Sequence, residues 1–241
     1  MKKIILTALF FYCVFSRASA QQDVQFSQYM LNPLFYNAGW AGLDGTSHIS
    51  AMHRTQWLGY SSSFDGDGGA PSSQLITFST PIKFKEKDLG VGVNFVNDKL
   101  GPLSNLNLEI ALAYHIKMRR GQLSLGLKPA IISQSIDFSQ FRFNDETDPL
   151  NIGTRESQMR PDLGFGAFYS TKLYTVGIGV NHLLRPSFDY GLNSATVNLQ
   201  NKVETNYNIS GTYDYKVSYN IIFSPSILIK TDLNNYSFDL S

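Results

Sequence analysis

The chain has 241 residues and a formal net charge of +1, with 16% charged and 13% aromatic residues. Ordinary soluble domains carry about 25% charged residues, so this composition is poor in charge and rich in rings. The lack of a basic excess gives no support to a nucleic-acid-binding function.

Residues 1–20 have the layout of a cleavable signal peptide. A positive start precedes an apolar run from Ile4 to Phe15, which is too short to cross a bilayer as a helix. Small residues then end at Ala20, and we predict cleavage before Gln21. The leader holds three of the 20 basic residues and none of the 19 acidic ones, so 17 basic residues face 19 acidic ones in the mature chain. The only cysteine, Cys13, leaves with the leader, which excludes disulfide and thiol chemistry.

The mature sequence predicts β-strands and no long helix. No stretch after the leader approaches the roughly 20 apolar residues of a membrane helix. Many segments instead alternate with period two, which places alternate side chains on opposite faces of a sheet. We count about ten such segments and predict a strand for each. They lie at about 47–56, 73–82, 89–95, 105–114, 122–128, 163–169, 174–180, 203–215, 219–231 and 234–241.

The two faces of these strands favour a membrane barrel over a secreted sandwich. One face is Leu, Ile, Val, Phe and Tyr, as lipid requires. The other is Gly, Ser, Asn, Thr and Gln with Glu109 and Lys128, which suits a barrel interior. Several aromatic residues fall near strand ends, where an interfacial girdle would lie: Phe95, Tyr114, Tyr169, Tyr174, Tyr213 and Tyr215.

The connections support the same fold and give an orientation. Long ones at 57–72, 134–157 and 183–202 and a medium one at 97–104 alternate with tight ones at 83–87, 119–121, 171–172 and 216–218. Outer-membrane barrels have short periplasmic turns and longer outer loops. Cysteine placed at Gly68 should therefore label from outside intact cells, whereas cysteine at Gly121 should not.

The fold class that we predict is an all-β, antiparallel transmembrane outer-membrane β-barrel. The last strand is shorter than the ~9–11 residues of a spanning strand, so we expect a truncated C-terminus. A complete barrel would have about 12–14 strands, since such barrels close with even numbers. We divide the chain into a signal peptide (1–20), a periplasmic or lumenal segment (21–45) and the barrel (46–241).

Three motifs resemble the PorP/SprF family of type IX secretion and gliding-motility membrane proteins. The first is the opening of the mature chain, residues 21–42, which contains Gln25, Phe26, Tyr29, Asn32 and Pro33; one helical turn near Tyr29 should end at Asn32-Pro33. The second is Arg54-Thr55-Gln56-Trp57-Leu58-Gly59. The third is Val96-Asn97-Asp98-Lys99-Leu100-Gly101-Pro102.

The resemblance implies a non-enzymatic outer-membrane component without a cofactor. Its partners would be outer-membrane lipid, periplasmic secretion-ring proteins and large secreted cargo proteins such as surface adhesins, with no small-molecule substrate. The alternative functions are a passive porin or hydrophobic-solute channel, and a soluble secreted sandwich.

Each motif has a functional and a structural interpretation. Residues 21–42 either dock a partner or seal the barrel mouth. Arg54, Gln56 and Trp57 either gate or contact cargo, or place an interfacial Trp beside a lumenal Arg paired with an acid. Asn97 and Asp98 either contact a partner or form a turn with Gly101-Pro102, and turn chemistry favours the latter.

Other candidate sites are weaker. The acidic stretches 65–69 and 145–148 resemble calcium loops but lack the full ligand pattern, so we expect solvated loops. The histidines of the mature chain have no zinc-like spacing. No nucleophile elbow or phosphate loop occurs, so we predict no catalytic site.

Overall fold

The computed structural model describes the whole chain except residues 1–22, 27, 60–69, 142–143, 145–152 and 191–199. The expected signal peptide, both acidic stretches at 65–69 and 145–148 and the labelling position Gly68 thus lie outside the described residues. No helix in the described part is both long and apolar enough to cross a membrane.

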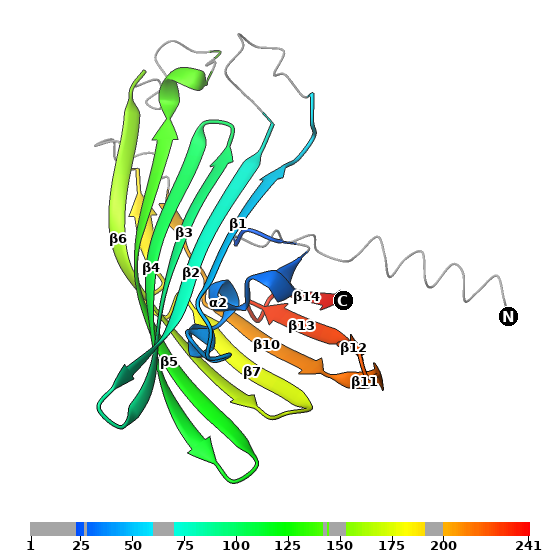
Figure 1. The fold of residues 1–241 in the computed structure, drawn as a ribbon. Helices are drawn as coiled ribbons and strands as arrows, with labels where there is room; N and C mark the ends of the chain where they lie inside the picture. Colours follow the sequence, from blue (N-terminus) through cyan, green and yellow to red (C-terminus); the bar gives the residue numbers. More distant parts are fainter. Residues whose placement is uncertain (1–22, 27, 60–69, 142–143, 145–152, 191–199) are drawn as a thin grey trace, which may run out of the picture.

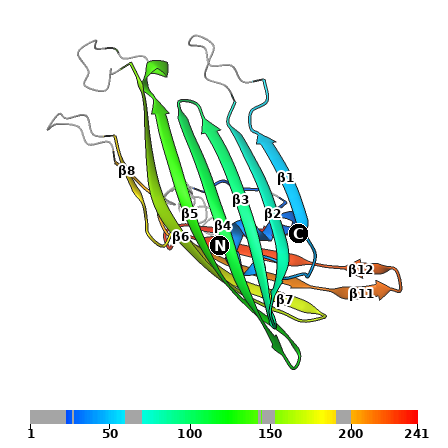
Figure 2. The same ribbon diagram turned by 60° about the vertical axis from the view of Figure 1, so that its left-hand side comes forward.

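One antiparallel sheet of ten strands forms the body of the protein (Figure 1). Its neighbours follow chain order, so each strand pairs with the next along the sheet. The strands are β1 (His48–Thr55), β2 (Ser72–Phe84), β3 (Lys87–Leu100), β4 (Leu103–Met118), β5 (Gly121–Asp137), β6 (Arg155–Ser170), β7 (Tyr174–Asn181), β10 (Asn206–Tyr213), β13 (Ser226–Thr231) and β14 (Tyr236–Leu240). The sheet curves into a trough, with β1 and β14 at its two edges in the described chain (Figures 1 and 2).

Two small two-stranded sheets interrupt the connections. β8 (Ser187–Asp189) pairs with β9 (Gln200–Lys202) between β7 and β10. β11 (Tyr215–Ser218) pairs with β12 (Ile221–Phe223) between β10 and β13, and this hairpin projects beyond the main sheet (Figure 2).

The period-two pattern places apolar side chains on one face of the sheet and small or polar side chains on the other, as the sequence predicts. In β4 the side chains of Leu108, Ile110 and Leu112 are 42%, 45% and 49% exposed on the outer face. The intervening Glu109 and Ala111 are buried on the concave face. An apolar band of this kind is costly in water and favourable in lipid.

Two connections differ from the expectation. Asn97 and Asp98 do not form a turn, because β3 and β4 stay paired up to Leu100 and Leu103. The turn is only Gly101-Pro102, where Gly101 takes a φ of 57° that other residues adopt rarely. The predicted medium-length loop at 97–104 is therefore a tight hairpin. The predicted turn at 216–218 is similarly displaced, since β11 continues to Ser218.

The segment before β1 lies in the trough of the sheet (Figure 1). It contains a 3₁₀ turn η1 (Tyr29–Leu31), a short helix α2 (Pro33–Tyr36) and a second 3₁₀ turn η2 (Ala38–Trp40). The expected helical turn at Tyr29 is confirmed, and it ends at Asn32, before Pro33 starts α2 at a position that proline favours. A last 3₁₀ turn, η3 (Phe138–Gln140), follows β5.

Candidate functional site: the lumenal seat of the N-terminal segment

The N-terminal segment, residues 23–45, fills the middle of the trough with apolar side chains. Phe26, Tyr29, Phe35 and Tyr36 are all buried and form one cluster with side chains of β2, β3 and β13. The ring centroids of Phe26 and Phe35 are 5.7 Å apart, edge to face. Burying a large apolar side chain contributes about 1.5–3 kcal/mol, so this cluster ties the segment to the wall.

Glycines on the sheet let the segment approach backbone to backbone. A Cβ added to Gly90 of β3 would lie 1.7 Å from the carbonyl oxygen of Ala41. A Cβ on Gly126 of β5 would lie 2.3 Å from the carbonyl carbon of Ala38. Both positions therefore exclude any side chain while the segment is seated.

Polar side chains of the sheet bind main-chain carbonyls of the segment, which α2 and η2 leave without helical partners. Asn94 donates to Leu34 O at 3.3 Å, and Lys128 donates to Phe35 O at 2.8 Å. Asn208 donates to Tyr36 O at 3.2 Å, and Ser124 donates to Gly39 O at 2.5 Å. Three strands, β3, β5 and β10, thus hold four carbonyls of one segment.

A buried ion pair supports this contact. Lys128 Nζ lies 2.8 Å from Glu109 Oε2, and their side chains are 2% and 6% exposed. Asn94 also donates to Glu109 at 2.9 Å. Buried charges persist when they are paired and hydrogen-bonded, as these are.

A second charged cluster anchors the start of the segment. His182, just after β7, lies 2.6 Å from Asp162 through Nδ1 and 3.0 Å from Asp23 through Nε2. Asn206 also donates to Asp23 at 2.6 Å. Burial disfavours the charged imidazole, but the carboxylates of Asp23 and Asp162 outweigh burial and raise the pKa of His182 to about 10. His182 is therefore protonated at neutral pH and joins the segment to the sheet.

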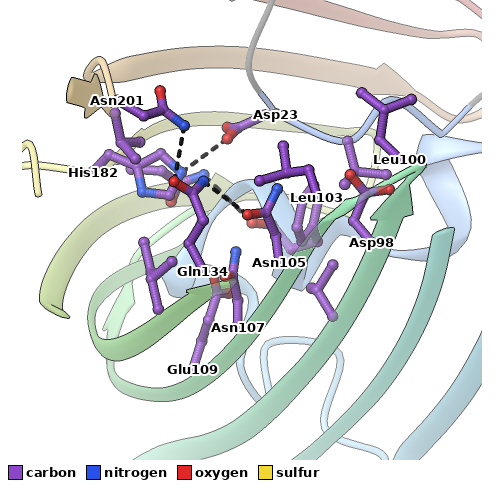
Figure 3. A pocket seen from close by; sticks show the side chains of 16 residues that line it. Asp23, Asp98, Leu100, Leu103, Asn105, Asn107, Glu109, Gln134, His182 and Asn201 are labelled. Atoms are coloured by element: carbon purple, nitrogen blue, oxygen red, sulfur yellow. Dashed lines mark hydrogen bonds and ion pairs between the residues drawn. The ribbon is translucent and has the colours of Figure 1, made fainter. Parts of the chain in front are cut away.

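A cavity of about 240 Å³ lies beside these two clusters (Figure 3). Asp23, Phe35, Glu109 and His182 line its inner part, and Leu100 and Leu103 line it near the β3–β4 turn. Gln134 donates to Asn105 at 2.8 Å and accepts from Asn201 at 3.0 Å, which forms an amide ladder along one side. The whole lining is Asp23, Val24, Phe35, Val96, Asp98, Leu100, Leu103, Asn105, Asn107, Glu109, Ile132, Gln134, Asn181, His182, Asn201 and Val203.

Most of the candidate contact residues from the first motif are buried where the N-terminal segment packs against the concave face of the sheet, a contact that we call the seat. Phe26, Tyr29 and Asn32 are 3%, 5% and 1% exposed. Pro33 begins α2. Gln25 accepts from Lys230 of β13.

The second and third motifs are divided between the lumen and the surface. Arg54 donates to the main-chain carbonyl of Gln25, so among the described residues its partner is the segment rather than an acid. Gln56 is half-buried, and Trp57 is 68% exposed just beyond β1. Asp98 faces the cavity, whereas Asn97 points to the opposite face because successive strand residues alternate.

Sequence reasoning did not identify the side chains that hold the segment. Glu109 and Lys128 were recognised only as charges on the small, polar face. Their signal was that each is an isolated charge among Gly, Ser and Ala on neighbouring strands. Asn94, Asn208 and His182 had no comparable signal.

An antiparallel sheet with a lipid-compatible outer face and a polar, filled interior is the wall of an outer-membrane β-barrel. The family model described as type IX secretion system membrane protein PorP/SprF matches residues 18–241. The chain belongs to this family and is a membrane component of the type IX secretion system. The search of curated proteins and the search of solved structures gave no significant match.

Proposed function

We propose that this protein supports the export or surface display of specific large cargo proteins by binding the periplasmic secretion ring, the cargo, or both. The proposed role is scaffolding without chemistry, in the outer membrane, after removal of the leader at 1–20. Family membership over residues 18–241 is the observation that carries the proposal. The expected ring proteins and cargo adhesins remain proposed partners.

The packing of the N-terminal segment in the trough gives less support to the alternative of a passive channel. An aqueous channel needs an open lumen. Here residues 23–45 pack against β2, β3, β5 and β13, with Phe35 and Tyr36 buried in the trough. Sealing the barrel mouth and supporting export are compatible, so we propose both for this segment.

Of the candidate contact residues, Trp57 and Gln56 are the ones that we propose for direct partner contact. Trp57 is exposed, and aromatic side chains are frequent anchors in protein interfaces. The buried residues Phe26, Tyr29 and Asn32 would instead shape the seat. Trp57→Ala should then reduce export while the protein level in the outer membrane stays normal.

The decisive experiment is a clean deletion in the native host, complemented by the wild-type gene. Mass spectrometry of the medium and of the cell surface should show that one or a few large proteins are lost while other secretion continues. Unchanged secretion together with reduced uptake of a small solute would support the channel instead. Purified protein in planar bilayers should show no steady conductance.

A further inference from the structure

The cavity beside the seat has more acceptors than donors. Its surroundings hold four carboxylates against two cations: Asp23, Asp98, Glu109 and Asp162 against Lys128 and His182. Both cations are already engaged. Lys128 binds Glu109 and Phe35 O, and His182 uses one ring nitrogen for each of its two carboxylates.

Two amide oxygens at the cavity are without a hydrogen-bond partner among the described residues. These are Oδ1 of Asn107 and Oδ1 of Asn181. Asn181 is only 6% exposed and belongs to the cavity lining. A buried acceptor without a donor loses its hydrogen bonds to water and gains none in return, so this position favours a ligand that brings N–H groups.

Of the four carboxylates, Asp98 has the fewest groups that balance its negative charge. It accepts from Ser73 Oγ at 2.5 Å, and no cation pairs with it in the described chain. It lies on β3 opposite Asn105 of β4, on the side of the cavity towards the β3–β4 turn (Figure 3). An incoming positive group would meet this carboxylate before the inner polar atoms.

The shape of the lining fits a long side chain with a charged end. Along β4 the cavity is bounded by Leu103, then Asn105 and Asn107, then Glu109 at the inner end. Val24, Val96, Leu100, Ile132 and Val203 add apolar surface. Lys and Arg bury an aliphatic stem against apolar surface and keep the charged head among polar groups.

A metal ion fits less well. No group of three or more His, Cys, Asp or Glu side chains in the described residues is arranged to hold one. The acceptors are spread along the cavity and separated by apolar side chains, as an elongated organic cation requires.

We propose that this cavity binds a lysine or arginine side chain carried by a polypeptide, with the charged end reaching Asp98 at the part of the cavity nearest the β3–β4 turn. That the polypeptide is exported cargo rests on the proposed function, whereas the binding chemistry does not.

The test is binding to the purified, full-length mature protein in detergent. The probe is a fluorescein-labelled Gly-Arg-Gly peptide, and its neutral isostere has citrulline in place of arginine. Fluorescence polarisation should show that the arginine peptide binds at least about tenfold more tightly, because a hydrogen bond to a charged group contributes about 1.5–3 kcal/mol. Equal binding of the two peptides, or no binding of either, would overturn the proposal.

The matched variants are Asp98→Asn and Asp214→Asn. Both carboxylates accept from a serine hydroxyl, Asp98 from Ser73 at 2.5 Å and Asp214 from Ser224 at 2.6 Å, but Asp214 follows β10 at the opposite end of the sheet. Asp98→Asn should weaken arginine-peptide binding about tenfold and Asp214→Asn should not. Equal effects of the two variants would overturn the proposal.

A third arm distinguishes the source of the charge. Free agmatine carries the guanidinium without a peptide backbone and should compete more weakly than the arginine peptide. Equal competition would overturn the assignment to a polypeptide. All of these measurements use purified protein, so a negative result would refute the binding site alone. A deletion strain that secretes normally would instead refute the proposed function.

Discussion

Breaking the buried Lys128–Glu109 pair should destabilise the protein strongly. Lys128→Met keeps the length of the side chain and removes the charge, which leaves the buried Glu109 with Asn94 as its one side-chain donor among the described residues. It also removes the donor to Phe35 O. Removing one partner of a buried pair costs about 3–5 kcal/mol, because the remaining charge stays in an apolar environment.

The assay is thermal unfolding of the detergent-solubilised protein, followed by heat-dependent mobility on gels. The matched control is Lys117→Met, which breaks an ion pair of 2.6 Å whose lysine side chain is 77% exposed and should change stability little. The double variant Lys128→Met/Glu109→Leu should recover much of the loss, since neither charge of this pair is left without its partner. If Lys128→Met is no less stable than Lys117→Met, the inferred burial of the pair is wrong.

Three further predictions test other parts of the molecule. Gly90→Ala should destabilise the protein by about 1–3 kcal/mol through overpacking against Ala41. Gly211→Ala should be tolerated, because the added Cβ would have no neighbour closer than 3.6 Å. Equal melting temperatures of the two variants would contradict the close packing of Ala41 on Gly90. Leu112→Arg should cost about 2–4 kcal/mol if the outer face of β4 lies in lipid, and normal folding into vesicles would argue against that orientation. The pKa of His182 is near 6.5 in the unfolded chain and about 10 in the folded protein, so between these pH values the folded state binds one more proton. The free energy of unfolding should therefore fall as the pH rises through this range, and His182→Gln should reduce that dependence.

The local pattern predicted most of the strands because each one follows the alternation of its own residues, although the strand predicted at 219–231 is divided into β12 and β13. Residues such as Leu108 and Ile110 could be assigned to one face without knowledge of any neighbour. The strands predicted at 47–56 and 73–82 likewise correspond to β1 and β2. Turn positions were less accurate, since Asn97 and Asp98 are good turn formers but the pairing of β3 with β4 extends them as strand.

The contacts of the N-terminal segment could not be predicted in this way. Asp23 and His182 are 159 positions apart, and nothing near either residue indicates the other. The same holds for the carbonyl of Phe35 and the side chain of Lys128, which lie 93 positions apart. Motif resemblance identified Phe26, Tyr29 and Asn32 as important but did not show that they face inwards.

The sequence by itself determined the export signal that we expect, the all-β class, the two faces of each strand and the family. These properties depend on neighbours along the chain, where period and composition are sufficient. Only the tertiary structure decided that residues 23–45 occupy the trough, that Glu109 and Lys128 pair, and that a cavity lined by amides and acids lies beside them. Those features depend on curvature, which brings distant strands around one segment, and on glycines such as Gly90 whose missing side chain matters only when another backbone arrives there.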